Sequence, residues 1–102
     1  MIPSWPLHEV ESERRRLEVL TYLAALPGYE AAAMLLRNQC RANGVPTNDD
    51  QIAACLQWLK EHGLVSIRVN PKSHEPIGKI TTTGRDVALG LRRYPGVMHP
   101  DP

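Results

Sequence analysis

The sequence predicts a mainly α-helical fold with a small β-hairpin, arranged as a winged helix-turn-helix. The stretch from Thr47 to Val65, TNDDQIAACLQWLKEHGLV, is predicted to be a helix with both ends marked. Two segments of alternating hydrophobicity, Leu64–Asn70 and Ile77–Thr81, follow it. A connection of only Gly44 to Thr47 joins this helix to the helical segment before it. These observations indicate a three-helix core, a two-stranded wing and a C-terminal helix.

The composition is that of one ordinary globular domain. The 102 residues are 42% hydrophobic and 23% charged, and none of them is phenylalanine, so the core must be built from other apolar side chains. No apolar run approaches the roughly 20 residues that span a bilayer, and the N-terminus lacks a signal-peptide pattern. We therefore expect a cytoplasmic protein without a membrane partner. Cys40 and Cys55 fall on apolar helix faces, where reduced thiols pack as small hydrophobes, although a disulfide between them is open in principle.

The first helix is predicted over His8–Leu26, after an irregular arm over 1–7 in which Trp5 could dock on a surface. Its apolar positions fall on one side, namely Val10, Leu17, Leu20, Leu23 and Ala24. Arg14–Arg16 lie on the other side among four glutamates. We interpret these arginines as a solvated face, with nucleic-acid contact as the alternative. Pro27-Gly28 ends the helix.

Two further helices flank the short connection. Glu30–Asn43 has helical spacing and Gly44 is its expected C′ residue. The next helix begins at Thr47 or Asn48, with Thr47 able to act as N-cap and Asp49 and Asp50 favoured by the dipole of the first turn. Gly63 ends it. Its apolar stripe is Ile52, Cys55, Leu56 and Leu59, and Trp58 is expected to pack at the edge of the core.

The predicted wing is followed by one more helix and a tail. Pro71–Pro76 forms a polar loop between the alternating segments. Thr82 or Thr83 can cap a last helix that runs to about Tyr94. Val87, Ala88, Leu91 and Tyr94 are expected to face the core. The domain then covers 8–94, and 95–102 is a proline-rich tail.

The residue types needed for catalysis do not come together in the sequence. The four histidines fall in four separate segments, none at metal-ligand spacing from a second histidine or a cysteine. There is no glycine-rich phosphate loop, and the first turn of a helix explains the adjacent carboxylates Asp49 and Asp50. We therefore expect no enzyme, no catalytic residue, no metal site and no cofactor.

Binding to double-stranded DNA is the favoured function at this stage. A recognition helix places outward polar residues at base edges, and amide side chains suit adenine. Residues 64–94 hold six Lys/Arg against two Asp/Glu, so basic character gathers in the wing and the last helix. Asp49 and Asp50 oppose this reading because carboxylates repel phosphates. The candidate DNA-binding residues are Arg37, Arg41, Asn48, Gln51, Gln57, Lys60, Arg68, Lys72 and Lys79.

Three runs carry a family resemblance: LEVLTYLAALPGY, QIAACLQWLKEHGLV and ITTTGRDVALGLRRYPGV with its proline-rich end. Their order resembles that of a family of short proteins encoded by Mu-like phages and prophages, over nearly the whole chain from about Leu17. The resemblance implies a winged-helix-like fold and a phage or prophage origin, hence a bacterial host cytoplasm. The family has no established biochemical function, so no functional residue is carried over.

Three hypotheses of function and partnership follow. The leading one is a DNA-binding protein that regulates phage transcription or assists DNA processing. The competing one is a protein–protein adaptor in phage assembly, whose acidic residues Asp49 and Asp50 face a basic partner. The third is a homodimer formed through the first and last helices.

Overall fold

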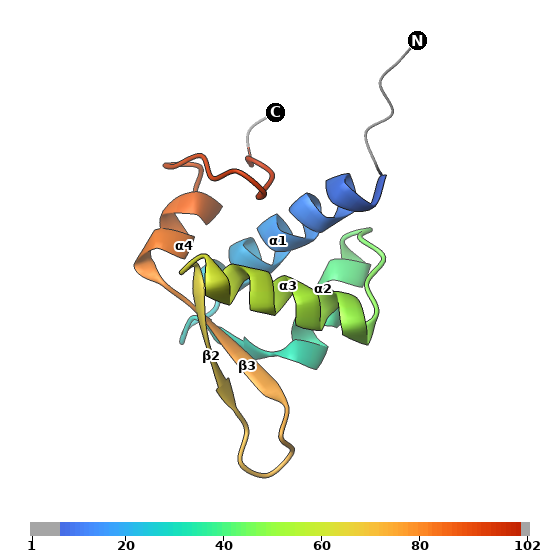
Figure 1. Cartoon of the computed structure of the whole chain (residues 1–102). Helices are drawn as coiled ribbons and strands as arrows, with labels where there is room; N and C mark the ends of the chain where they lie inside the picture. The colour runs from blue at the N-terminus through green and yellow to red at the C-terminus, as the bar shows by residue number, and fades with distance from the viewer. Residues whose placement is uncertain (1–6, 101–102) are drawn as a thin grey trace.

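The computed structural model describes residues 7–100 as four helices and a three-stranded antiparallel sheet (Figure 1). This mixed α/β fold is compatible with the predicted winged-helix-like arrangement. The predicted arm, with Trp5, lies outside the described residues except for Leu7, the first residue of α1. The elements are α1 Leu7–Ala25, β1 Glu30–Ala32, α2 Ala33–Ala42, α3 Asp49–Glu61, β2 Val65–Val69, β3 Pro76–Ile80 and α4 Thr82–Ala88.

Strand β1 corrects the prediction that a helix begins at Glu30. The three residues Glu30–Ala32 pair antiparallel with β3, Ala31 lying opposite Gly78, and the sheet order is β1-β3-β2. The sheet therefore has three strands, where the sequence indicated two. Gly78 allows β3 to approach the helices, because a Cβ there would lie 3.1 Å from a methyl carbon of Leu56.

The β2–β3 hairpin projects beyond the helices, and its loop is tied back to α2. Val65 is buried near the start of β2, whereas Val69 at its end is 56% exposed. In the loop, the Asn70 side chain accepts hydrogen bonds from the backbone N–H groups of Lys72 and Ser73. The Glu75 carboxylate accepts from the backbone N–H of Met34 at 2.8 Å. Because Ala32, the N-cap residue of α2, has no capping side chain, Glu75 supplies the missing acceptor.

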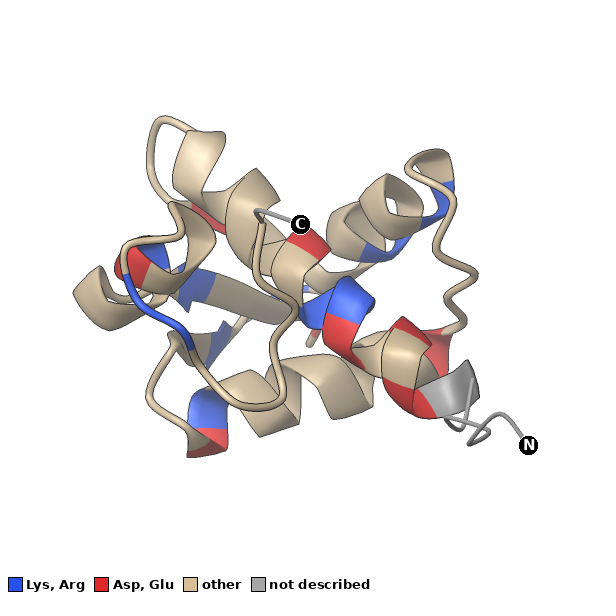
Figure 2. Cartoon of the chain, turned by 90° about the horizontal axis from the view of Figure 1, so that it is seen from above, with Lys and Arg blue, Asp and Glu red and all other residues tan. Residues whose placement is uncertain are grey.

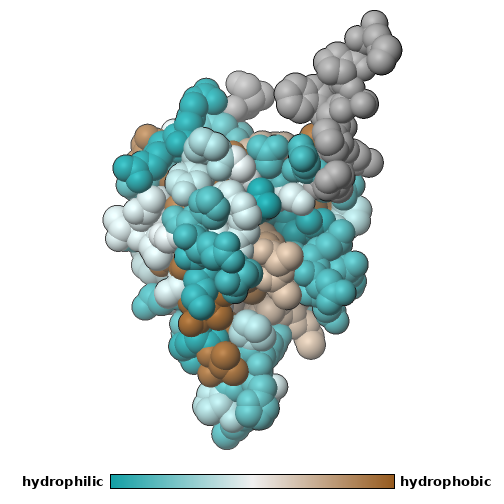
Figure 3. Space-filling view, in the orientation of Figure 1, coloured by the Kyte–Doolittle hydropathy of each residue, from teal (hydrophilic) through white to brown (hydrophobic). Residues whose placement is uncertain are grey.

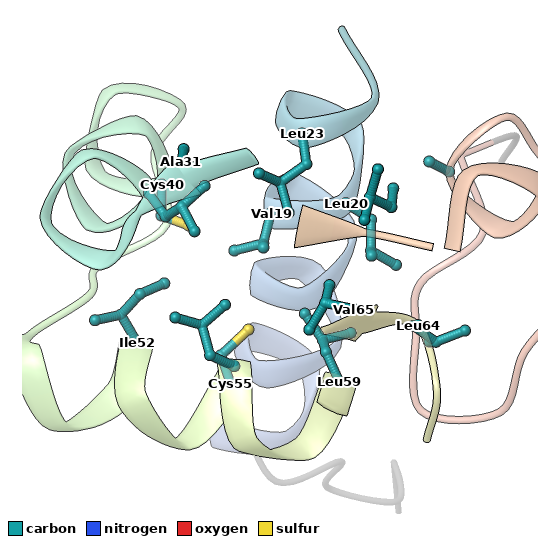
Figure 4. Close-up of a cluster of buried hydrophobic side chains, with 14 of the residues drawn as sticks. Val19, Leu20, Leu23, Ala31, Cys40, Ile52, Cys55, Leu59, Leu64 and Val65 are labelled. Atoms are coloured by element: carbon teal, nitrogen blue, oxygen red, sulfur yellow. The ribbon is translucent and has the colours of Figure 1, made fainter. Parts of the chain in front are cut away.

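The core forms where α1, α2 and α3 meet the inner face of the sheet (Figure 4). Fully buried leucines come from all three helices and from the residue before β2: Leu20, Leu23, Leu36, Leu56, Leu59 and Leu64. Cys40 and Cys55 are buried in the same cluster as free thiols, which confirms their predicted packing role. The apolar stripe predicted for α3 is likewise buried.

Helix α4 is shorter than predicted. Its N-cap is Thr81, which accepts from the backbone N–H of Gly84, and the helix ends at Ala88. Gly90 has φ +77°, so the chain turns away before the predicted end at Tyr94. Leu91 is consequently 74% exposed, and the prediction that it faces the core is wrong. The tail returns to the molecule: Val97 is buried and the N–H of Met98 bonds to the carbonyl of Glu13.

Candidate nucleic-acid interface

The connection between α2 and α3 is held by two arginines. Arg15 of α1 donates from Nε to Thr47 Oγ1 at 3.0 Å and from Nη2 to the carbonyl of Pro46 at 2.6 Å. Arg41 of α2 donates to the carbonyl of Thr47 at 2.7 Å. The hydroxyl of Thr47 in turn donates to the carbonyl of Val45. Thr47 is therefore buried in the connection, and the prediction that it caps α3 is wrong.

Asn48 is the N-cap of α3 and forms a capping box with Gln51. Asn48 Oδ1 accepts from the backbone N–H of Gln51 at 2.8 Å, and Gln51 Oε1 accepts from the backbone N–H of Asn48 at 2.9 Å. An amide reads adenine with its oxygen and its NH₂ together, and here both oxygens are occupied. These two predicted base-reading side chains thus keep only their NH₂ groups for a base.

Three of the predicted phosphate contacts bind groups of the protein itself. Arg37 forms an ion pair with Asp49, and Arg68 forms one with Glu30 at 2.9 Å. The hydrogen bond from Arg68 lowers the pKa of the Glu30 carboxyl and raises that of the Arg68 guanidinium. Arg41 is used in the connection described above. Since their charge is balanced or their donors are occupied, these arginines contribute less to a phosphate site than the sequence suggested.

The four other candidates are exposed polar residues, two on α3, one in the hairpin loop and one on the outer face of the sheet. Lys60 lies in the last turn of α3 and Lys72 in the hairpin loop. Gln57 of α3 donates to Glu61 at 3.0 Å. Lys79 lies opposite Ser66 in the sheet, on the outer face that points away from the buried face. Figure 2 shows basic segments dispersed around the molecule, with acidic segments between them.

The Arg14–Arg16 run is not the solvated face that the sequence indicated. Arg15 is buried, and Arg14 donates to the carbonyl of Asn43 at 2.9 Å. Arg16 donates to the carbonyl of Gly96 at 2.8 Å and lies 4.1 Å from the ring centroid of Trp58. Burial lowers the pKa of the Arg16 guanidinium. The run therefore ties α1 to the α2–α3 connection and to the C-terminal tail.

Trp58 packs at the edge of the core, as predicted. Its ring stacks on His62 with 3.8 Å between centroids, and Tyr94 meets it edge-on. The hydroxyl of Tyr94 lies 2.9 Å from Nδ1 of His62. Arg16 covers the same ring system, so Trp58 is occupied by its own neighbours and is not a free stacking platform for bases.

An apolar hollow of about 410 Å³ lies between α2, α3 and the hairpin loop. Met34, Ile52, Ala53 and Pro76 line it, together with Glu75 and the ion pair of Arg37 with Asp49. Met34 is 57% exposed. Figure 3 shows strongly hydrophobic residues on the hairpin and weakly hydrophobic residues beside it, on a largely hydrophilic surface.

Two classes of site are absent from the part of the chain that the structure describes. Residues 7–100 contain no group of three or more His, Cys, Asp or Glu side chains that could hold a metal ion. Among the same residues, no helix is both long and apolar enough to cross a membrane.

Comparisons with known proteins found no relative of this chain. No protein-family model matches the chain, and no curated protein is similar to it. The resemblance to short proteins of Mu-like phages and prophages therefore stays a prediction, as does a phage origin.

Proposed function

We propose that the protein is a non-enzymatic winged-helix DNA-binding protein of phage or prophage origin, which regulates transcription or assists DNA processing. The observation that carries this proposal is the hydrogen-bonded connection between α2 and α3. Arg15 and Arg41 hold the carbonyls of Pro46 and Thr47, so that the polar outer face of α3 has a fixed position beside the hairpin. A helix fixed in this way suits insertion into a major groove without the loss of conformational entropy that a mobile helix would incur.

The contacts we propose differ from the set that the sequence suggested. Lys60 and Lys72 meet phosphates, because both are exposed and lie on α3 and on the loop that the hairpin presents. Gln57 and the NH₂ groups of Asn48 and Gln51 face the bases. With two lysines carrying most of the electrostatic attraction, the DNA affinity should be modest and its salt dependence shallow compared with a protein that makes many phosphate contacts.

The test is fluorescence anisotropy of a labelled duplex, titrated with protein at several salt concentrations. We expect salt-sensitive binding that weakens in Lys60→Gln and in Lys72→Gln, each lowering the slope of log K against log salt by about 1. Lys79→Gln is the matched control, since it removes the same charge from the outer face of the sheet. Absence of binding even at low ionic strength would overturn the proposal. Arg41→Ala is a poor probe because it also disturbs the connection.

A specific observation favours a second candidate, the protein–protein adaptor. The hollow between α2, α3 and the hairpin loop has a largely apolar lining, which suits an apolar side chain, and its charged residues are Glu75 and the ion pair of Arg37 with Asp49. The occupant we propose is a segment of a phage protein with an apolar residue flanked by Lys or Arg. Asp50, exposed in the first turn of α3 and in neither ion pair of the described residues, would supply a carboxylate to those basic residues.

This candidate is tested by capture of partners from phage-infected cells. We expect one protein to be retained by the wild type and lost with Met34→Glu, which places a charge in the hollow. Leu35→Glu is the control, because Leu35 is exposed on the same helix and does not line the hollow. Recovery of nucleic acid without a protein, or a partner that Met34→Glu retains, would exclude the adaptor.

A further inference from the structure

A second hollow, of about 260 Å³, lies between α1 and α3 and shares no residue with the hollow beside the hairpin loop. Each helix contributes four side chains to its lining, which are Glu11, Ser12, Arg15 and Arg16 from α1 and Gln51, Ala54, Cys55 and Trp58 from α3. The α1 side carries the charges, and the α3 side is mainly apolar. Sites for drug-sized ligands measure roughly 300–1,000 Å³, so this α1–α3 hollow suits a smaller molecule that has both charged and apolar parts.

Arg16 lines the α1–α3 hollow with a guanidinium group that has one unused edge. Its Nη1 donates to the carbonyl of Gly96 at 2.8 Å. Its Nε is the only buried side-chain nitrogen or oxygen of residues 7–100 without a hydrogen-bond partner, and Nη2 has no partner among these residues either. The N–H groups of Nε and Nη2 point the same way and fit a carboxylate with two parallel hydrogen bonds. Since a buried donor without an acceptor destabilises the protein, this edge favours a carboxylate ligand.

Arg15 adds a second guanidinium group to the same wall. It is 4% exposed, its Nε and Nη2 donate to Thr47 Oγ1 and to the carbonyl of Pro46, and its Nη1 has no partner within residues 7–100. Arg16 is held against the ring of Trp58, 4.1 Å from its centroid. Both arginines are thus fixed before a ligand arrives, which lowers the entropic cost of binding an anion.

Glu11 places an unpaired carboxylate in the same hollow. Glu11 and Arg15 lie four residues apart on α1, the spacing at which opposite charges pair on a helix. Neither ion pair of residues 7–100 includes them, and Arg15 reaches toward the α2–α3 connection instead. Glu11 therefore has no hydrogen-bonded partner among these residues, and the hollow carries a free acceptor together with free donors.

We propose that the α1–α3 hollow binds a small zwitterion of the amino-acid class. The carboxylate of the ligand accepts hydrogen bonds from Arg15 and Arg16, its ammonium group donates to Glu11, and its apolar side chain packs on Ala54 and Trp58. An anion alone is repelled by Glu11 and an amine alone by the two arginines, whereas a zwitterion balances both charges. The site depends on neither DNA binding nor the adaptor function, so its test succeeds or fails independently of both.

The test is a titration of the whole isotope-labelled chain with each proteinogenic amino acid, followed by two-dimensional NMR. We expect amino acids with apolar side chains to shift the backbone amide signals of the residues that line the hollow, with a dissociation constant of about 1 mM or lower. For the tightest binder, the N-acetyl derivative lacks the ammonium charge and the carboxamide lacks the carboxylate, so each should bind at least about ten-fold more weakly. No saturable shift with any amino acid would refute the proposal, and an N-acetyl derivative that binds equally tightly would refute the zwitterion class.

Matched variants separate binding in the hollow from binding elsewhere. Ala54→Leu fills the hollow and should abolish the shifts, whereas Ala53→Leu makes the same change at the next exposed position, outside the hollow, and should bind as the wild type does. Glu11→Gln should weaken binding about ten-fold and remove the preference over the N-acetyl derivative. Glu9→Gln, outside the hollow, should change neither. Circular dichroism checks that all four variants are folded, and binding that Ala54→Leu retains would exclude this hollow as the site.

Discussion

Arg15 determines the geometry of the α2–α3 connection more directly than any residue within the connection itself. Its guanidinium is buried, and it reaches from α1 to Thr47 Oγ1 and to the carbonyl of Pro46. Neither ion pair found within residues 7–100 includes it. Its burial is therefore balanced by hydrogen bonds to the carbonyl of Pro46 and to the Thr47 hydroxyl, which itself donates to the carbonyl of Val45.

We predict that Arg15→Met lowers the free energy of unfolding by about 2–4 kcal/mol, because it leaves a buried hydroxyl and a carbonyl without their donor. Urea denaturation followed by circular dichroism measures the change. Arg14→Met is the matched control: Arg14 is exposed and makes one bond to the carbonyl of Asn43, so the expected loss is below about 1 kcal/mol. Equal losses in the two variants would show that Arg15 has no special role.

At the scale of elements, α4 packs so closely against the residue before β2 that its first turn contains a glycine, although glycine is a poor helix former. Gly84 lies in the first turn of α4, directly against the end of the loop that leads into β2. A Cβ at this position would lie 2.2 Å from the carbonyl oxygen of Leu64 and 2.8 Å from a side-chain carbon of Ile80. The contact with Leu64 is with backbone, which cannot rotate away, so glycine is needed here for packing.

We predict that Gly84→Ala destabilises the protein, although alanine favours a helix by about 1 kcal/mol relative to glycine. The overlap with the Leu64 carbonyl should outweigh that gain and lower the free energy of unfolding by about 1–3 kcal/mol. Thermal unfolding measures the difference. Gly28→Ala serves as the control, because nothing lies within 4 Å of the added Cβ and no large change is expected. A stabilised Gly84→Ala variant would mean that α4 can move away from β2.

The helix ends were predictable where their signals are local. Gly44 and Gly63 have positive φ at the ends of α2 and α3, and the acidic first turn of α3 lies where the sequence placed it. Strand β1 was not predictable in this way, because Glu30–Ala32 has no strand propensity and pairs with residues nearly fifty positions away. The end of α4 did not follow from helical spacing, which continues to about Tyr94, because Gly90 takes φ +77° and turns the chain after Ala88.

The candidate site was only partly predictable for the same reason. Exposure of Lys60 and Lys72 follows from the polar face of α3 and from the polar loop. The internal partners of the arginines do not follow, because an ion pair such as Arg68 with Glu30 requires strands that are distant in sequence to be adjacent. The choice between Thr47 and Asn48 as N-cap was likewise decided by Arg15, thirty-two residues before Thr47.

On the scale of the whole molecule, the core holds two thiols that should make stability depend on alkaline pH. Cys40 and Cys55 are buried, and burial raises the pKa of Cys40 to about 11 and that of Cys55 to about 12. The ordinary value is 9.0. The folded protein therefore retains protons that the unfolded chain releases. Stability is fully present below about pH 9 and is lost as the pH rises toward the folded-state pKa values.

We predict that the free energy of unfolding falls above about pH 9 by about 1.4 kcal/mol per thiol for each pH unit, until the folded-state values are reached. Urea denaturation at a series of alkaline pH values measures the slope. The double variant Cys40→Ala with Cys55→Ala removes both groups and should therefore lose this slope. If the double variant lost stability as steeply as the wild type, the buried thiols would not be its cause. A second measurement is the rate at which the thiols react with a maleimide. If the folded wild type reacted as fast as the protein unfolded in urea, Cys40 and Cys55 would not be protected in the core.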